Sequence, residues 1–156
     1  MNERFDPTLF TLLPHRPPML LVNQIVQLNE QRSETIVIID AKSPFSSDLG
    51  VPSWIGLEYM GQTAALIAGY QEQAGLCEPQ LGFLMGSRKY TSSIEHFANG
   101  QNLRIICEQG TLVGSSLANF NCTIKNAIGD SDDLDDGQTI ATATLSVFRR
   151  PLNEMA

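Results

Sequence analysis

The sequence predicts an α+β fold in which one long helix packs against the concave face of an antiparallel sheet. One segment of about twenty residues is apolar or small on nearly every side, as in a buried helix. Strand-like segments follow it, two of them with strict apolar/polar alternation, and no helical segment lies between them. With 156 residues the chain can bury a core. We expect a single domain over residues 1–156, with its core at about 12–150.

Before the helix, we predict an extended lead-in, a strand and a loop. Residues 12–22 (LLPHRPPMLLV) hold three prolines, which fix φ and remove backbone donors, so a rigid extended lead-in should precede a short strand. Residues 35–39 are β-branched and apolar, which favours a strand. Residues 43–52 contain two prolines, a glycine and four small polar residues, and should form a loop.

The central helix is predicted over residues 54–75, about six turns. Gly75 can end it at the C′ position, where glycine is favoured. Glycine inside a helix costs about 1 kcal/mol relative to alanine, so we expect close approach of the sheet to explain the small residues of this segment. These are Gly56, Gly61, Ala64, Ala65, Ala68 and Gly69.

The second half of the chain predicts strands. Apolar and polar residues alternate over residues 118–124 and again over 141–147, which indicates strands with one solvated face. Residues 83–85 and 103–107 are two further strand candidates. The Asp-rich segment 129–137 should join two long strands as a solvated loop, because its ligand spacing departs from that of an EF-hand calcium site.

Charge and cysteine content restrict the function classes. The net charge of -7 argues against a nucleic-acid binder, which needs a basic face, and against adsorption to an anionic membrane surface. Three cysteines without a C-x-x-C pair argue against a disulfide framework. The N-terminal residues lack the layout of a signal peptide, and no stretch is apolar for long enough to span a bilayer. We therefore expect a cytoplasmic protein.

Glu58 is the first candidate for catalysis, because it falls in the second turn of an otherwise apolar helix. Apolar surroundings favour a neutral carboxyl and the helix N-terminus favours a carboxylate, so Glu58 could donate or accept a proton near neutral pH. Gln62 lies one turn later on the same face and could hydrogen-bond to Glu58 and orient it. The alternative is a charge at the helix rim that only interacts favourably with the helix dipole.

His15 is the second candidate, since a histidine base must be either His15 or His96. His15 lies in the proline-rich lead-in, where an ordinary polar turn residue is the alternative. His96 precedes a predicted Asn99–Gly100 turn and is the weaker candidate. Two histidines without clustered cysteines argue against a structural zinc site, and we expect no metal.

Two basic pairs end predicted strands: Arg88 with Lys89, and Arg149 with Arg150. Such charges ordinarily keep strand ends soluble. One of the pairs could instead dock an acidic carrier protein or a pantetheine phosphate.

Two segments, LPHRPPMLLV (13–22) and GVPSWIGLEYMGQTAA (50–65), together resemble the FabZ/FabA-like 3-hydroxyacyl-carrier-protein dehydratases. The segments GFLMGSRKY (82–90) and FANGQNL (97–103) are most similar to the ApeP-like subgroup associated with aryl polyene synthesis. The resemblance implies a hotdog fold, and dimers joined edge to edge with active sites at the subunit interface. It also implies an acyl carrier protein as partner, with the substrate on phosphopantetheine or coenzyme A and no further cofactor.

Glu58 and Gln62 match the acidic residue of this family and the glutamine four positions later. The chain departs from the family at one position. FabZ proteins carry their catalytic histidine in a G-H-F-P segment fourteen residues before the acid, where this chain has Pro44, and the surrounding loop contains no histidine.

The leading hypothesis is dehydration of a 3-hydroxyacyl thioester to the 2-enoyl thioester. Glu58 would be the acid and His15 the base, and the N–H groups around Trp54, Ile55 and Gly56 would bind the thioester oxygen. The first alternative, prompted by Pro44, is a subunit that binds acyl thioesters but depends on a partner, in a homodimer or a hotdog heterodimer. The second is thioester hydrolysis, in which a carboxylate activates water and no histidine is needed.

Overall fold

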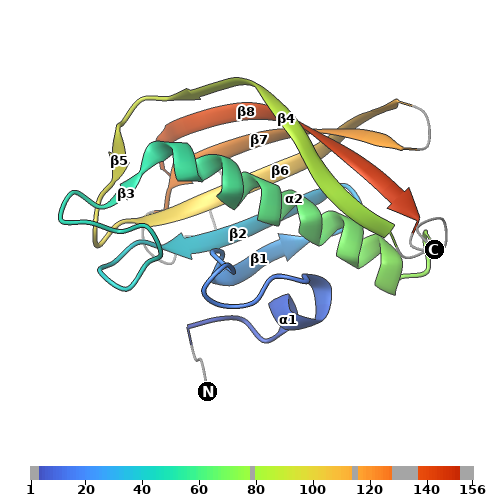
Figure 1. The fold of residues 1–156 in the computed structure, drawn as a ribbon, viewed down its shortest axis with the longest axis horizontal. Coiled ribbons are helices and arrows are strands. Elements are labelled where there is room, and N and C mark those ends of the chain that lie inside the picture. Colours follow the sequence, from blue (N-terminus) through green and yellow to red (C-terminus); the bar gives the residue numbers. More distant parts are fainter. Residues whose placement is uncertain (1–3, 78–79, 114–115, 128–136, 152–156) are drawn as a thin grey trace.

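A computed structural model describes residues 4–77, 80–113, 116–127 and 137–151 of the chain. Its main feature is a six-stranded antiparallel sheet that curves round one long helix, with strand order β1-β2-β6-β7-β8-β4 (Figure 1). The sheet is open, because β1 and β4 at its two edges do not pair with each other. Its strands are β1 (Gln24–Leu28), β2 (Arg32–Ile38), β4 (Gln80–Ser92), β6 (Asn102–Val113), β7 (Leu117–Asn126) and β8 (Thr139–Pro151).

The central helix, α2 (Gly56–Gln73), follows a single 3-10 turn, η1 (Ser53–Ile55). It ends as the sequence predicts: Gly75 has φ +73°, and the Leu76 N–H donates to the Gln71 carbonyl across 2.9 Å. This bond pattern is a Schellman motif at the helix C-terminus. Before the turn, the two-residue strand β3 (Val51–Pro52) pairs with β5 (His96–Phe97).

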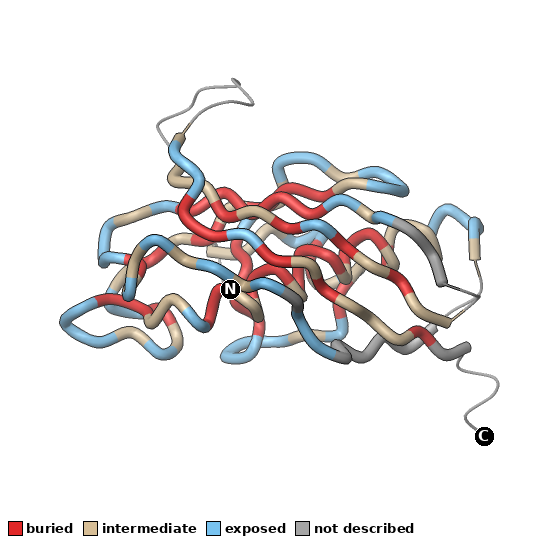
Figure 2. The backbone as a smooth tube through the Cα atoms, turned by 90° about the horizontal axis from the view of Figure 1, so that it is seen from above, coloured by how far each residue is buried: buried red, intermediate tan, exposed pale blue. Residues whose placement is uncertain are grey.

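The core lies between the helix and the concave face of the sheet, where the buried residues gather (Figure 2). The predicted alternation is confirmed in β7 and β8, whose inward side chains include Phe120, Ile124 and Leu145. Buried hydroxyls tie the helix to the sheet: Ser33 Oγ donates to the Thr63 carbonyl across 2.6 Å. Hydrophobic burial holds this unit together, and the paired hydroxyls remove the cost of burying polar groups.

The lead-in differs from the prediction. A short helix, α1 (Thr8–Leu12), precedes it, and the first strand begins only at Gln24. The N–H groups of Leu21 and Val22 are bound by the side chain of Gln62 and not by a neighbouring strand. The predicted extended backbone is only partly present, because residues 17–19 form a turn in which the N–H groups of Met19 and Leu20 donate to the Arg16 carbonyl. The local sequence also gave no sign that a helix side chain would bind the residues that follow this turn.

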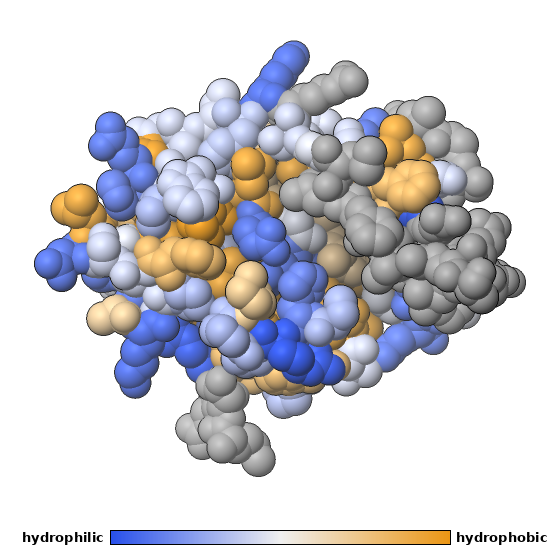
Figure 3. Space-filling model, in the orientation of Figure 1, coloured by the Kyte–Doolittle hydropathy of each residue, from blue (hydrophilic) through white to orange (hydrophobic). Residues whose placement is uncertain are grey.

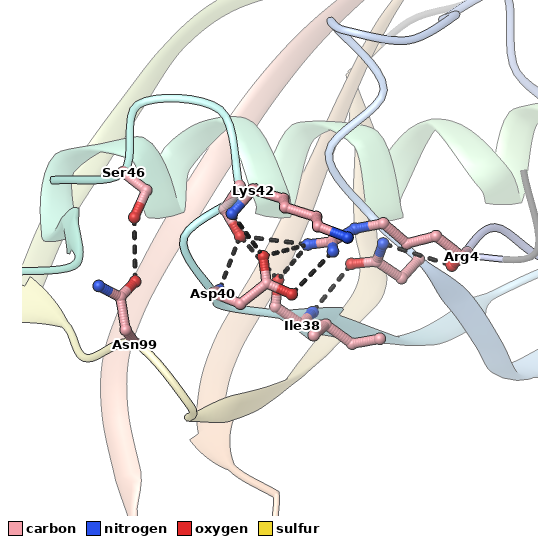
Figure 4. Close-up of polar contacts among 8 residues, drawn as sticks. Arg4, Ile38, Asp40, Lys42, Ser46 and Asn99 are labelled. Carbon is pink, nitrogen blue, oxygen red and sulfur yellow. Dashed lines mark hydrogen bonds and ion pairs between the residues drawn. The ribbon is translucent and has the colours of Figure 1, made fainter.

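The loop after β2 is held by polar contacts at its start and in its middle (Figure 4). The Arg4 guanidinium donates to Asp40 across 2.8 Å, and this interaction lowers the pKa of the Asp40 carboxyl. Ser46 Oγ donates to the Asn99 side chain across 2.9 Å. The loop is thereby fixed to the N-terminal segment and to the turn after β5.

The Asp-rich segment 129–137, predicted to form a loop, lies outside the described residues except for Gly137. Over the part of the chain that the structure describes, no helix is long and apolar enough to cross a membrane.

Candidate active site

A cavity of about 210 Å³ runs along one face of α2. The helix contributes residues spaced three or four apart, which places them on one side of it. Between these and the sheet, the lead-in, β7 and β8 supply the remaining wall. The helix residues that line the cavity are Glu58, Gly61, Ala64, Ala65, Ala68, Gly69 and Glu72. Because the five between Glu58 and Glu72 have almost no side chain, this face of the helix forms a channel between two acidic residues.

His15 and Glu58 both line this cavity, although they come from distant parts of the sequence. His15 is half-buried, and its Nδ1 is buried without a hydrogen-bond partner among the described residues. Burial lowers the pKa of His15 below its usual 6.5, and the negative charge of Glu58 partly opposes this shift. At neutral pH the imidazole is therefore uncharged and able to accept a proton.

Gln62 joins the two segments that carry these side chains. Its Nε2 donates to Glu58 Oε1 across 3.3 Å and to the Met19 carbonyl across 2.8 Å. Its Oε1 accepts the N–H groups of Leu21 and Val22 at 2.9 and 3.4 Å. One buried amide thus holds the lead-in against the helix beside the carboxyl group of Glu58.

The structure does not bring Trp54, Ile55 and Gly56 to this cavity. The Trp54 side chain is exposed, whereas Ile55 is buried in the core. The N–H of Gly56 already donates to the Ser53 carbonyl in the 3-10 turn, so Gly56 is not free to bind a substrate oxygen. The sequence suggested that the N–H of Gly56 would be available to bind a substrate oxygen, but the 3-10 turn before the helix uses this N–H.

Pro44, where FabZ proteins have their histidine, lies away from Glu58. It lines a separate small cavity of about 10 Å³ together with Tyr59 and the side of β2. His96 lies in β5 and does not line the cavity that contains Glu58. Of the two histidines, the structure places His15 beside the acid.

Arg149 is a site residue whose position the sequence did not reveal. Instead of keeping a strand end soluble or docking a carrier, it is 8% exposed and lines the cavity. The alternation of side chains along β8 could have predicted this position. Arg149 lies an even number of residues after the inward-facing Ala143 and Leu145, so its side chain should face the same side of the sheet. In the other basic pair, Lys89 is exposed on β4, and the side chain of Arg88 is not among those that the structure describes. Within the described ranges, no group of three or more histidine, cysteine or acidic side chains could hold a metal ion.

A model of the ApeP-like family, described as ApeP dehydratase, matches residues 7–156. The dehydratase heterocomplex ApeI:P from Xenorhabdus doucetiae is similar in structure, with a TM-score of 0.76 and 20% identity over 94% of this chain and 93% of that chain. The smu.793 protein from Streptococcus mutans UA159, bound to acetyl-CoA, has a TM-score of 0.63 and 14% identity over 90% of this chain and 96% of that chain.

A hypothetical thioesterase from Streptococcus pneumoniae TIGR4, solved with coenzyme A, has a TM-score of 0.59 and 12% identity over 82% of this chain and 85% of that chain. No curated protein matches. At these identities the solved structures establish the architecture, and the predicted hotdog fold is confirmed.

Proposed function

The chain belongs to the ApeP-like dehydratase family, and we propose from this that it dehydrates a 3-hydroxyacyl thioester to the trans-2-enoyl thioester in fatty-acid-like or aryl polyene synthesis. The substrate would be carried on the phosphopantetheine of an acyl carrier protein. The proposal rests on one observation: His15 and Glu58 line the same cavity. No metal or redox cofactor is needed, because the reaction is an elimination of water.

The proposed chemistry divides the proton transfers between the two side chains. The thioester carbonyl makes the α C–H acidic, and the uncharged imidazole of His15 takes this proton. The electron pair forms the new double bond as the bond from C3 to its hydroxyl oxygen breaks. For this step Glu58 must first take up a proton, because a carboxylate cannot act as the acid. It then protonates the departing oxygen, so water leaves. Transfer of the proton from His15 back to Glu58 restores both groups.

Gln62 would act as a positioning residue, since its amide binds Glu58 and the lead-in together. No N–H group is assigned to the thioester oxygen, because Trp54, Ile55 and Gly56 do not line the cavity that contains Glu58 and His15. Arg88 and Lys89 are our proposed contacts for an acidic carrier protein.

Replacing Glu58 by glutamine tests the assignment. Because Glu58→Gln keeps the shape and the hydrogen bond but cannot deliver a proton, we expect kcat for dehydration to fall by about 10²- to 10⁴-fold. His15→Gln should have a similar effect. The measurement is mass-spectrometric detection of the 2-enoyl product from a 3-hydroxyacyl carrier protein. Full activity in Glu58→Gln would overturn the assignment.

Matched controls come from the same chain. His96→Gln changes the other histidine, and Glu95→Gln changes an exposed acid outside the cavity. Both should retain the activity of the unmodified protein. Loss of activity in either control would point to a general effect on folding.

A second candidate function is a subunit that becomes active only with a hotdog partner. Two observations favour it: Pro44 stands where FabZ proteins have a histidine, and the similar ApeI:P dehydratase is a heterocomplex. The edge strand β4 has no partner on its outer side among the described strands, so a second copy or a different hotdog subunit could pair there. Dehydration by the purified chain alone would exclude this alternative.

Thioester hydrolysis is the third candidate. A thioesterase is among the proteins that share the fold, and a carboxylate that activates water requires no histidine. Release of free thiol from acyl-CoA or acyl carrier protein distinguishes hydrolysis from dehydration. No thiol release across chain lengths would exclude it.

A further inference from the structure

We propose that Arg16 is a positioning residue for His15: its guanidinium group fixes the turn of the lead-in that places the imidazole in the cavity beside Glu58. This inference rests on the proposed function, because it takes His15 as the base. Arg16 itself does not line the cavity and would act only through the residue before it.

Burial does not hold the residues around His15 in place. Pro14 and residues 16–19 are exposed, and His15 is only half-buried. The firm contacts lie on either side of this stretch: Leu13 is buried in the core, and Gln62 binds the backbone that follows. Hydrogen bonds must therefore fix the backbone between these two anchors, and with it the direction of the imidazole.

The side chain of Arg16 supplies three such bonds. Its Nη1 donates to the carbonyls of Leu13 and His15, each across 2.8 Å, and its Nη2 donates to the Phe10 carbonyl across 2.9 Å. The guanidinium carbon also lies 5.3 Å from the centre of the Phe10 ring, within the range of a cation–π interaction. One side chain thus ties the carbonyl of His15 to the end of α1.

The sequence explains why the end of α1 needs this donor. In a continuing helix, the Phe10 carbonyl would accept the N–H of the residue four positions later. That residue is Pro14, which has no N–H, and Nη2 of Arg16 takes the place of the missing donor. A guanidinium can bind several carbonyls at once because its five N–H groups form a rigid planar fork, whereas the ammonium group of lysine is a compact point charge.

The backbone of Arg16 secures the chain on the other side of His15. The Arg16 carbonyl accepts the N–H groups of Met19 and Leu20 at 2.8 and 3.1 Å. Without the Arg16 side chain, the turn keeps these bonds but loses those on the His15 side. A displacement of about 1 Å in a catalytic group can lower the rate about 10²-fold. Because Arg16 does not line the cavity, this loss should fall on kcat and leave KM nearly unchanged.

Chemical rescue tests the role of the guanidinium. In Arg16→Ala, kcat for dehydration should fall about 10- to 100-fold. Added methylguanidinium should restore part of kcat, whereas methylammonium should not, because it has the charge without the planar fork. Arg4→Ala is the matched control, because Arg4 also binds a backbone carbonyl, that of Ile38, but does not line the cavity. It should keep the kcat of the unmodified protein, with or without either ion.

NMR titration of His15 provides a second measurement that does not depend on activity. Burial lowers the pKa of His15, and the charge of Glu58 partly opposes this shift. If the turn relaxes in Arg16→Ala, the ring becomes hydrated and its pKa should rise towards 6.5, since burial is the larger effect. Arg16→Lys retains the positive charge, so a rise in this variant comes from the turn and not from the lost charge. Thermal unfolding shows whether each variant is folded.

Three outcomes would overturn the inference: an unchanged kcat in both folded Arg16 variants, an unchanged pKa of His15 in both, or equal restoration of kcat by the two ions. The proposed function is measured separately, by dehydration in the unmodified protein. A higher pKa of His15 in both Arg16 variants of a protein without dehydratase activity would leave the positioning role standing and overturn the function alone.

Discussion

Gln62 is fully buried on the central helix, and its amide oxygen and nitrogen both make two hydrogen bonds. Three of these bonds go to the backbone of residues 19–22 and the fourth goes to Glu58. An amide can satisfy two donors and two acceptors at once, whereas a carboxylate or a hydroxyl cannot. At the scale of single residues, this explains why a glutamine occupies the position one turn after the acid. It fixes both the acid and the segment that leads to His15.

The ionisation of His15 gives a prediction at this scale. Burial lowers the pKa of His15 below 6.5, and Glu58 opposes the shift. Because the neutral form is the base, protonation of His15 should lower kcat/KM only as the pH falls below 6.5. In Glu58→Gln the opposing charge is lost, so the pKa of His15 should decrease further.

NMR titration of the two imidazole rings measures this, with His96→Gln to assign the signals. An unchanged or higher pKa of His15 in Glu58→Gln would show that the two side chains do not interact.

At the scale of elements, the small residues of α2 serve two different purposes. A Cβ at Gly56 would meet Tyr90 and Ile124, so this glycine permits close approach of the sheet, as the sequence suggested. A Cβ at Gly69 would instead meet the carbonyl of Leu12 at the end of α1. At Gly61 that explanation is wrong. A Cβ there would meet nothing within 4 Å, because Gly61 faces the cavity. The absence of a side chain at this position leaves open space in the cavity.

Gly61→Leu should therefore block the channel without harming the fold. The free energy of unfolding should stay the same or rise by about 0.5–1 kcal/mol, since leucine favours a helix more than glycine does. Meanwhile kcat/KM for long-chain substrates should fall by at least about tenfold. Urea unfolding and steady-state kinetics measure the two effects.

Gly69→Ala provides the contrast, because the clash with the Leu12 carbonyl should cost stability, about 1–3 kcal/mol. If Gly61→Leu destabilised the protein as much as Gly69→Ala, the cavity at Gly61 would not be open space.

At the scale of the whole molecule, one end of the fold carries exposed apolar side chains. Phe45, Leu49 and Trp54 are all more than half exposed and lie within ten residues of sequence. Figure 3 shows hydrophobic side chains at the end of the molecule where β3 and its preceding loop lie in Figure 1. Exposed apolar groups that gather in this way mark interaction surfaces. Among the described strands, β1 and β4 at the two edges of the sheet also have no partner on their outer sides, so the sheet edges are further surfaces for assembly.

The sole tryptophan makes the first surface testable. If assembly with a hotdog subunit covers this end, Trp54 should pass from water to an apolar environment, so its fluorescence should shift to shorter wavelength and resist quenching by iodide. Leu49→Arg should weaken the assembly, as measured by sedimentation. Assembly without any change in Trp54 fluorescence would place the interface elsewhere, for example at an edge of the sheet.

Much of the architecture could be predicted because its signals are local. The alternation in residues 118–124 and 141–147, the apolar run of the helix and the glycine at position 75 each reflect an element's own periodicity or termination. The short helix at residues 8–12 and the pairing of β3 with β5 were missed, because they are short and depend on tertiary contacts. The lead-in was predicted as extended, but its binding by Gln62 was not foreseen.

The sequence by itself determined the helix and strand pattern, the resemblance to the dehydratases, and the spacing that allows Gln62 to reach Glu58. These follow from neighbouring residues, whose relation is fixed by backbone geometry. Only the tertiary structure decided that His15 shares a cavity with Glu58, that Pro44 lies in another, and that Arg149 is buried at the end of the channel. Such relations depend on how distant segments pack around one helix, and packing is decided by the burial of the whole chain.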